Sequence, residues 1–220
     1  MPKNNDKPSL RERKQAQTKL TLLKIAIEKL KEKPLDHISV KEICDEVPVS
    51  EVTFYNYYPT KQDLLIFYLK LWSVEIIHNL KNKCGKDSGL QAIETFFTYN
   101  AKRMQENPIL VKEIIVKISG GEEPPCFGSL TQAELEYAFP NEKGIKDESF
   151  REISDIFQPY LKNAVKKGEL PKETNQELVL NVLSTMFLGL LLTFPVAKGK
   201  NLSTLYKKHL SLLWAGLKAQ

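Results

Sequence analysis

The sequence predicts an all-α protein, and three observations support this fold class. Apolar residues recur at steps of three and four, which places them on one face of a helix. Capping residues, glycines and prolines divide the chain into segments of helical length. No stretch alternates apolar and polar residues for long between turn signals, so no convincing strand is expected. With 220 residues, 42% hydrophobic and 27% charged, the composition is that of a soluble globular protein.

The first helix is predicted over residues 16–30. Its apolar stripe consists of Ala16, Leu20, Leu23, Ile27 and Leu30. Lys and Glu residues occupy the opposite face, as expected for a helix with one buried side. Pro34 is expected to end this helix, because proline has no N–H and disfavours helix in the residue before it.

Two short helices are expected next, over residues 40–47 and 51–58. Ser39 and Glu42 have the spacing of a capping box, and Ser50 is the expected N-cap of the second helix. The turn between them is too short for an antiparallel pair, so the helices must cross steeply, as in a helix-turn-helix. Phe54 and Tyr58 are expected to face inward at this crossing.

Longer helices are predicted over the rest of the chain. Thr60 and Asp63 form the expected cap of a helix that runs to about Lys83. The other predicted helices cover residues 88–106, 108–118, 129–139, 147–168, 173–195 and 201–218. Glycines and prolines mark the boundaries between them.

The second short helix presents a face that suits DNA. Its outward positions are Glu51, Val52, Tyr55 and Asn56, leading to Tyr57. Asparagine can bond to two atoms of an adenine edge, and tyrosine hydroxyls can donate to phosphates. Thr60 and Lys61 follow at the start of the next helix, where free N–H groups and an ammonium would hold a phosphate. A helical hairpin that only packs against the rest of the chain is the alternative.

Charge and cysteine usage add two expectations. Residues 1–24 carry seven Lys or Arg and two acids, so this arm accounts for the whole net charge of +5. Such an arm is typical of polyanion binding, and equally of a solvated, frayed tail. Three widely spaced cysteines and a charged start favour a cytoplasmic protein without disulfides or a secretory signal.

The residues of this region resemble the TetR/AcrR family of bacterial transcription regulators. From Ser50 the chain carries the run S-E-x-T-F-x-N-Y-[FY]-P-T-K-x-D-L-L. Together with residues 11–30 and 43–47, the resemblance covers about residues 10–70. A weaker echo lies at residues 167–171, where the family often has a break between its last long helices.

The resemblance implies a homodimeric repressor that a small, often lipophilic effector releases from an inverted-repeat operator in double-stranded DNA. It implies a DNA-binding domain over residues 1–63 and an effector-binding and dimerisation domain over residues 64–220. Carried over by position, the DNA contacts are Ser39, Ser50, Tyr55, Asn56, Tyr57, Thr60 and Lys61. No cofactor is implied.

Two positions depart from the family pattern. Pro48 occupies a turn position where the family usually has glycine, so we expect the turn to deviate, since proline cannot adopt a positive φ. Glu51 opens the recognition helix where a cation or small residue is common. Its carboxylate can accept from a cytosine amino group or only favour the helix start.

The later helices suggest two further sites. The residues expected to line an effector pocket are Trp72, Phe96, Tyr99 and Phe157, although plain core packing is the favoured interpretation for each of them taken singly. The residues expected at a dimer interface are Phe157, Leu161, Val165, Val182, Leu183 and Met186. Residues 178–197 carry no charge and have the length of a membrane span, but a helix buried by its own fold and by a second subunit is the favoured interpretation.

Catalysis and metal binding have little support. The sequence lacks the GxSxG, HExxH, GxxxxGK[ST] and GxGxxG motifs, and its three histidines are scattered. We therefore expect neither an enzyme nor a metal site. A helical protein–protein interaction module without DNA binding is the alternative function.

Overall fold

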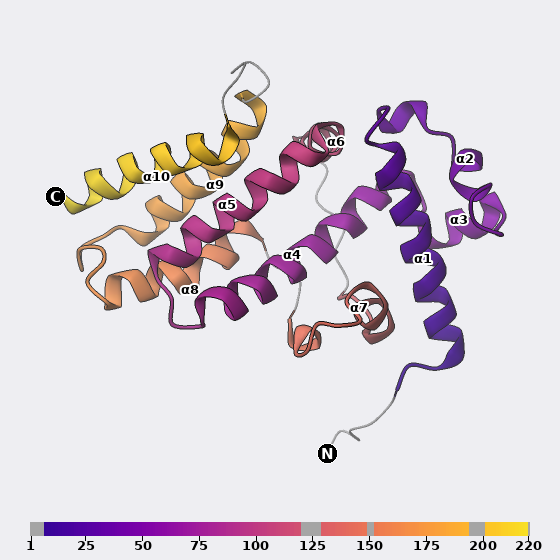
Figure 1. Cartoon of the computed structure of the whole chain (residues 1–220), viewed down its shortest axis with the longest axis horizontal. Helices are drawn as coiled ribbons and strands as arrows, with labels where there is room; N and C mark the ends of the chain where they lie inside the picture. Colours follow the sequence, from indigo (N-terminus) through magenta and orange to yellow (C-terminus); the bar gives the residue numbers. More distant parts are fainter. Residues whose placement is uncertain (1–6, 120–128, 149–151, 194–200, 220) are drawn as a thin grey trace. The chain divides into compact units, whose positions relative to one another are not determined.

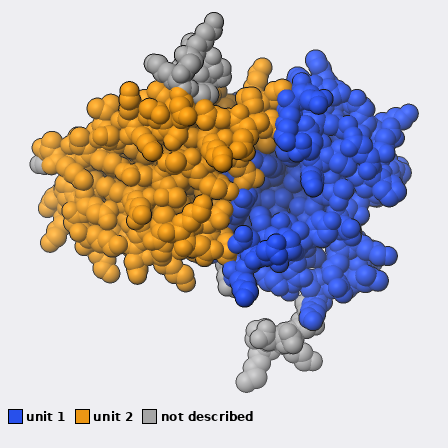
Figure 2. All heavy atoms as spheres, viewed as in Figure 1, with its two compact units in different colours: residues 1–75, 116–150 blue, residues 76–115, 151–220 orange. Residues whose placement is uncertain are grey.

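The computed structural model describes residues 7–119, 129–148, 152–193 and 201–219. All regular structure in these four segments is helical, so the predicted fold class is confirmed. The chain forms two compact units, which Figure 2 colours separately. Unit 1 comprises residues 1–75 and 116–150, and unit 2 comprises residues 76–115 and 151–220. The expected domains, a DNA-binding domain up to residue 63 and an effector-binding and dimerisation domain after it, do not coincide with these units. They remain predictions about function.

The helices of each unit are labelled in Figure 1. Unit 1 contains α1 (Leu10–Lys29), the 3₁₀ helix η1 (Leu35–His37), α2 (Val40–Cys44), α3 (Glu51–Tyr57), the first half of α4 (Asp63–Cys84), the end of α6 (Pro108–Ser119), α7 (Gln132–Ala138) and the 3₁₀ helix η2 (Ile145–Asp147). Unit 2 contains the remainders of α4 and α6 together with α5 (Leu90–Glu106), α8 (Ile153–Lys166), α9 (Gln176–Thr193) and α10 (Leu202–Lys218).

The first helix is longer than its apolar stripe predicted. It begins at Leu10, where Ser9 and Glu12 form a capping box: the Glu12 N–H donates to the Ser9 hydroxyl, and the Glu12 carboxylate accepts the Ser9 N–H. α1 ends at Lys29, so Pro34 does not stop it directly. Pro34 instead precedes η1, where its missing N–H costs nothing.

Two predicted segments extend beyond the described residues. They are residues 1–6 of the basic arm and residues 194–197 of the uncharged segment.

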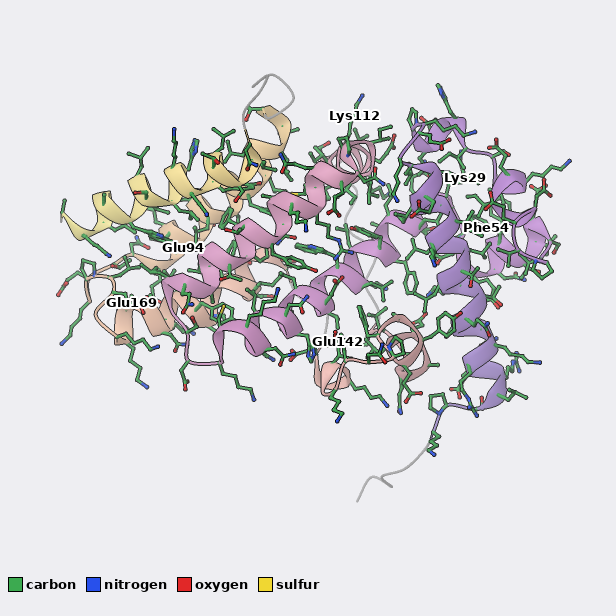
Figure 3. The ribbon with its side chains drawn as sticks, in the orientation of Figure 1. Lys29, Phe54, Glu94, Lys112, Glu142 and Glu169 are labelled. Carbon is green, nitrogen blue, oxygen red and sulfur yellow. The ribbon has the colours of Figure 1, made fainter. Side chains whose placement is uncertain are left out.

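The core of the α1–α4 region forms as predicted. The predicted capping box of Ser39 and Glu42 starts α2, which ends at Cys44, three residues earlier than expected. Phe54 is fully buried and Tyr58 is 1% exposed, so both face inward. Figure 3 labels Phe54 in α3. Burying such aromatic rings supplies most of the free energy that holds short helices together.

In unit 1, α7 packs along α1. Its Leu135 forms a small buried cluster with Val74 of α4 and Ile145 of η2. The partly buried Leu130 and Phe139 cover this cluster. A segment far from α1 in the sequence is therefore part of the same compact unit.

The core of unit 2 is an aromatic cluster at the meeting point of α5, α8, α9 and α10. Its rings are Phe96, Phe97, Phe157, Phe187 and Tyr206. Phe97 and Phe157 stack with centroids 5.6 Å apart, and the Tyr206 hydroxyl donates to the Phe187 carbonyl at 2.8 Å. Edge-to-face and stacked geometries of this kind add to the burial free energy of the rings.

Candidate nucleic-acid interface

The turn between α2 and α3 accommodates Pro48 without a positive φ. The Val49 N–H donates to the Val47 carbonyl at 2.6 Å, which closes a three-residue turn around Pro48. The central residue of an inverse γ-turn has a φ near the value that proline fixes. Ser50 then starts α3, where its hydroxyl accepts the Thr53 N–H at 3.2 Å, as its predicted N-cap role requires.

The outward face of α3 consists of the residues that the sequence predicted. Val52 is 71% exposed and Tyr55 is 48% exposed, while Glu51 and Asn56 are also exposed. Val52 and Asn56 are four residues apart, and Tyr55 lies three residues after Val52, so the three share one side of the helix. Tyr57 is half-buried at the end of α3.

Tyr58 fixes the end of α3 against α1. Its hydroxyl donates to the Lys19 carbonyl at 2.8 Å, and its ring lies edge-on to Phe67 of α4 with centroids 5.9 Å apart. Burial, with a smaller contribution from the Glu134 carboxylate, raises the pKa of the Tyr58 phenol well above its usual value. The phenol therefore stays neutral and keeps donating this hydrogen bond.

Thr60 and Lys61 both bond to other groups of this chain: the pairing of Thr60 with Asp63 was predicted as a helix cap, whereas the acceptors of Lys61 were not predicted. The Thr60 N–H and hydroxyl both donate to the Asp63 carboxylate, at 2.7 and 2.9 Å. The Lys61 ammonium donates to the carbonyls of Leu35 and Ile38, at 3.0 and 2.9 Å. Lys61 thus satisfies the end of η1 and keeps one of its three N–H donors for another acceptor. The Ser39 hydroxyl is exposed and accepts the Glu42 N–H at 3.1 Å.

Basic and acidic side chains form ion pairs in the part of unit 1 that contains α2 and the end of α1. Lys29 pairs with Glu46 at 2.5 Å and Lys33 pairs with Glu42 at 2.8 Å. Figure 3 labels Lys29 near the end of α1. The first turns of α1 expose further basic side chains, namely Arg11, Arg13 and Lys14. These cations belong to the same unit as α3.

The residues predicted to form an effector pocket are distributed over both units. Trp72 is buried in unit 1. Phe96 and Phe157 are fully buried neighbours in unit 2, with ring centroids 4.7 Å apart. Tyr99, half-buried on α5, accepts from the Asn79 side chain at 3.4 Å. The structure therefore brings Phe96 and Phe157 together as core residues of unit 2.

The predicted dimer residues fall into two groups. Phe157, Leu161 and Leu183 are fully buried in the core of their own chain. Val165, Val182 and Met186 are half-buried. Periodicity identified the apolar residues of α8 and α9 but could not tell which of them the chain itself covers.

A comparison with protein-family models supports the resemblance stated above. Residues 22–66 match the model described as bacterial regulatory proteins, tetR family. The matched segment runs from the middle of α1 through α2 and α3 into α4, and so includes the whole outward face of α3. The resemblance to the TetR family is confirmed.

Solved structures share the fold over almost the whole chain. One is Thermus thermophilus FadR, a TetR-family transcriptional repressor solved with lauroyl-CoA, which has 18% identity and a TM-score of 0.62 over 89% of this chain and 92% of that one. A TetR transcriptional regulator from Rhodococcus sp. RHA1 has 18% identity and a TM-score of 0.52, covering 94% of this chain and 99% of that one.

A third structure is the Mycobacterium tuberculosis ketosteroid transcriptional regulator KstR2, with 11% identity and a TM-score of 0.50 over 91% of this chain and 95% of that one. A comparison with curated proteins gave no match. The protein therefore has the helix-turn-helix and the all-α fold of TetR-type transcriptional regulators, and these structural neighbours are regulators and not enzymes.

Proposed function

We propose that this protein is a cytoplasmic transcriptional regulator that places α3 in the major groove of its operator. The observation that carries the proposal is the exposed face of Val52, Tyr55 and Asn56 on a helix held by the buried Phe54 and Tyr58. An amide and a phenol on a rigid support can bond to base edges and phosphates. The neighbouring Ser39, Ser50 and Lys61 would contact the DNA backbone.

The proposed assembly is a homodimer formed through the outer face of α9. This helix buries Val179, Leu183, Phe187 and Leu191 at steps of four against its own unit. On the opposite side, Leu178, Val182, Thr185, Gly189 and Leu192 follow steps of four and three and are exposed or half-buried. α10, which packs against α9, also exposes an apolar side chain, Leu212, which is 74% exposed. A second copy that covers this stripe would complete a four-helix bundle.

The membrane alternative for the same helix has weaker support. Among the described helices, α9 is the one that is long and apolar enough to span a membrane, with a mean hydropathy of 1.5. That criterion concerns length and composition alone. The inner face of α9, including Phe187, is committed to a packed aromatic core, whereas a membrane span would face lipid around most of its circumference.

The proposed regulation is release from DNA by a small lipophilic effector bound in unit 2. Unit 2 is rich in aromatic and aliphatic side chains, such as Phe96 and the half-buried Tyr99, which is the chemistry that an apolar ligand requires. FadR, which shares the fold, was solved with lauroyl-CoA, so medium-chain acyl compounds are reasonable first probes. An effector acts if it binds the non-DNA-binding conformation better than the DNA-binding one.

Binding of the purified protein to its own upstream DNA, compared with scrambled DNA at matched salt, tests the function. We expect specific binding that falls steeply with salt. Asn56→Ala should weaken specific binding by roughly tenfold or more, the loss of a good base contact. A protein–protein module would instead bind both duplexes equally and weakly, and a selection from a random library would show no preferred sequence.

A further inference from the structure

Lys19 of α1 contacts three other helices of unit 1. Its ammonium donates to Glu134 of α7 at 2.6 Å and lies 3.8 Å from the centroid of the Phe67 ring in α4. Its backbone carbonyl accepts the hydroxyl of Tyr58, the residue that ends α3, at 2.8 Å. A displacement of α7 can therefore reach the recognition helix through two directly bonded contacts.

Both oxygens of Glu134 are occupied. One accepts the Lys19 ammonium, and the other accepts the Thr131 N–H at 2.8 Å in a capping box that starts α7. The side chain of Glu134 is 9% exposed and that of Lys19 is 23% exposed. Removing one partner from such a shielded pair leaves an unpaired charge, which is far costlier than losing a surface ion pair.

A second cation lies close to this pair. Burial lowers the pKa of Lys70 on α4, the nearby Lys19 lowers it further, and Glu134 raises it. Glu134 thus offsets the repulsion between two ammonium groups that α1 and α4 bring together. Without this carboxylate, α1 and α4 would carry like charges at their contact.

α7 and the recognition helix also line a common cavity. A surface cavity of about 200 Å³ is lined by Lys19 of α1, by Asn56 and Tyr57 of α3, and by Thr131 and Glu134 of α7. Two residues of the proposed DNA interface therefore share a cavity wall with the cap of α7. The position of α7 sets the surroundings of α3 on this side.

We propose that α7 is a brace for the DNA-reading surface and that Glu134 is the positioning residue through which it acts. The inference rests on the proposed DNA-binding function. Glu134 does not touch DNA; it holds Lys19, Lys19 holds Tyr58, and Tyr58 fixes the end of α3. Residues 129–148 therefore belong functionally with the DNA-binding segment, although they follow it by more than sixty residues in the sequence.

The test compares Glu134→Gln with Glu136→Gln, a matched change on the same helix. Glu136 pairs with Lys146 of η2 and accepts from Gln132 of its own helix. The probe is the duplex that the wild-type protein selects from a random DNA library. We expect Glu134→Gln to weaken binding about tenfold, a typical coupling for residues in one bonded network. Glu136→Gln should stay within about twofold of the wild type, as surface changes usually do.

A third variant separates positioning from folding. Lys19→Met combined with Glu134→Gln removes both charges and leaves no unpaired ion, so its loss of affinity should be smaller than the sum of the two single losses. All variants are measured at a temperature where near-ultraviolet circular dichroism shows them folded. Hydrogen exchange of the α3 amides should accelerate in Glu134→Gln and not in Glu136→Gln.

The outcomes distinguish this inference from the function on which it rests. Equal DNA affinity for Glu134→Gln and Glu136→Gln, or strictly additive losses in the double variant, overturns the brace and leaves DNA binding intact. A wild-type protein that selects no sequence overturns both proposals together.

Discussion

At the scale of single residues, Glu169 shows how one side chain can start a helix elsewhere in the chain. The N-cap of α5 is Gly89, which has no side chain to accept a backbone N–H. The Glu169 carboxylate takes this role and accepts the Leu90 N–H at 2.7 Å. Figure 3 labels Glu169 in the loop after α8. The Asn163 side chain adds bonds to the carbonyls of Lys86 and Ser88. Together they fix the α4–α5 connection.

The close approach of Glu169 leaves little room for a side chain at residue 89. A Cβ at this position would lie 2.4 Å from a carboxylate oxygen of Glu169. We predict that Gly89→Ala lowers the free energy of unfolding by about 1–3 kcal/mol, because the carboxylate must move and the Leu90 N–H loses its acceptor. Urea unfolding followed by circular dichroism measures this change.

The matched comparison removes the carboxylate of Glu169 itself. Glu169→Ala should cost a similar amount, and the double variant should cost less than the two changes added, since neither clash nor cap remains. Additive costs would show that Gly89 and Glu169 act independently.

Only the helix break near Glu169 could be predicted from the sequence. The family resemblance implies a helix break at residues 167–171, and Gly168 ends α8 with a φ of +72°. The role of Glu169 could not be predicted, because its partner Leu90 lies 79 residues away. The internal bonds of Lys61 could not be predicted for the same reason, since its acceptors, Leu35 in η1 and Ile38 just after it, lie 26 and 23 residues away.

At the scale of elements, short helices depend on their caps. α2 has only five residues and begins with the reciprocal bonds of Ser39 and Glu42. This box was predictable because it needs only a serine and a glutamate three residues apart. The box of Ser9 and Glu12 at the start of α1 has the same spacing but precedes the apolar stripe, so periodicity alone placed the start of that helix six residues late.

The pKa of Glu42 makes the contribution of this cap depend on pH. The Lys33 ammonium and then the Ser39 N–H lower the pKa of the Glu42 carboxyl to about 2. Because this pKa is depressed, the ionised Glu42 stabilises the fold at pH values above the usual glutamate pKa of about 4. This stabilisation is lost as the pH falls toward 2. We predict that wild type and Glu42→Gln differ in urea midpoint at pH 7 and converge as pH approaches 2.

The exposed Glu32 provides the control for this pH series. Glu32→Gln removes a nearby carboxylate that makes no capping box. A constant difference between wild type and Glu42→Gln from pH 7 to pH 2 would contradict the assignment of the low pKa to Glu42.

At the scale of the whole molecule, the two faces of α9 give the chain a surface that a second copy can cover. A charge at Leu183 would enter the core of unit 2, because this side chain is fully buried, so it cannot report on assembly. Leu178 and Met186 are better sites, since they are 58% exposed and half-buried. We predict that Leu178→Glu with Met186→Glu converts the proposed dimer to a folded monomer in analytical ultracentrifugation.

A polar neighbour provides the comparison for this prediction. Glu177 is exposed beside Leu178, and Glu177→Gln should leave the dimer intact. Persistence of the dimer in the Leu178→Glu and Met186→Glu variant would place the interface elsewhere.

The sequence predicted most of the helices and which residues of α3 face outward, but it predicted less about which helices pack against one another. The inward Phe54 and outward Tyr55 follow from helical periodicity within one short segment. The packing of α7 on α1 depends on Lys19 and Glu134, which are 115 residues apart and carry no local signal of their pairing. Long-range ion pairs of this kind need the fold before they can be recognised.

The central claim is that the outward face of α3 reads DNA in a symmetric dimer. The most direct measurement is a hydroxyl-radical footprint of the wild-type protein on its selected duplex, beside Tyr55→Ala and Asn56→Ala. We predict two protected half-sites with centres one helical turn apart, about 34–36 Å, or a multiple of that distance, and loss of both in the variants. Uniform protection, or a footprint that the variants leave unchanged, would contradict the account.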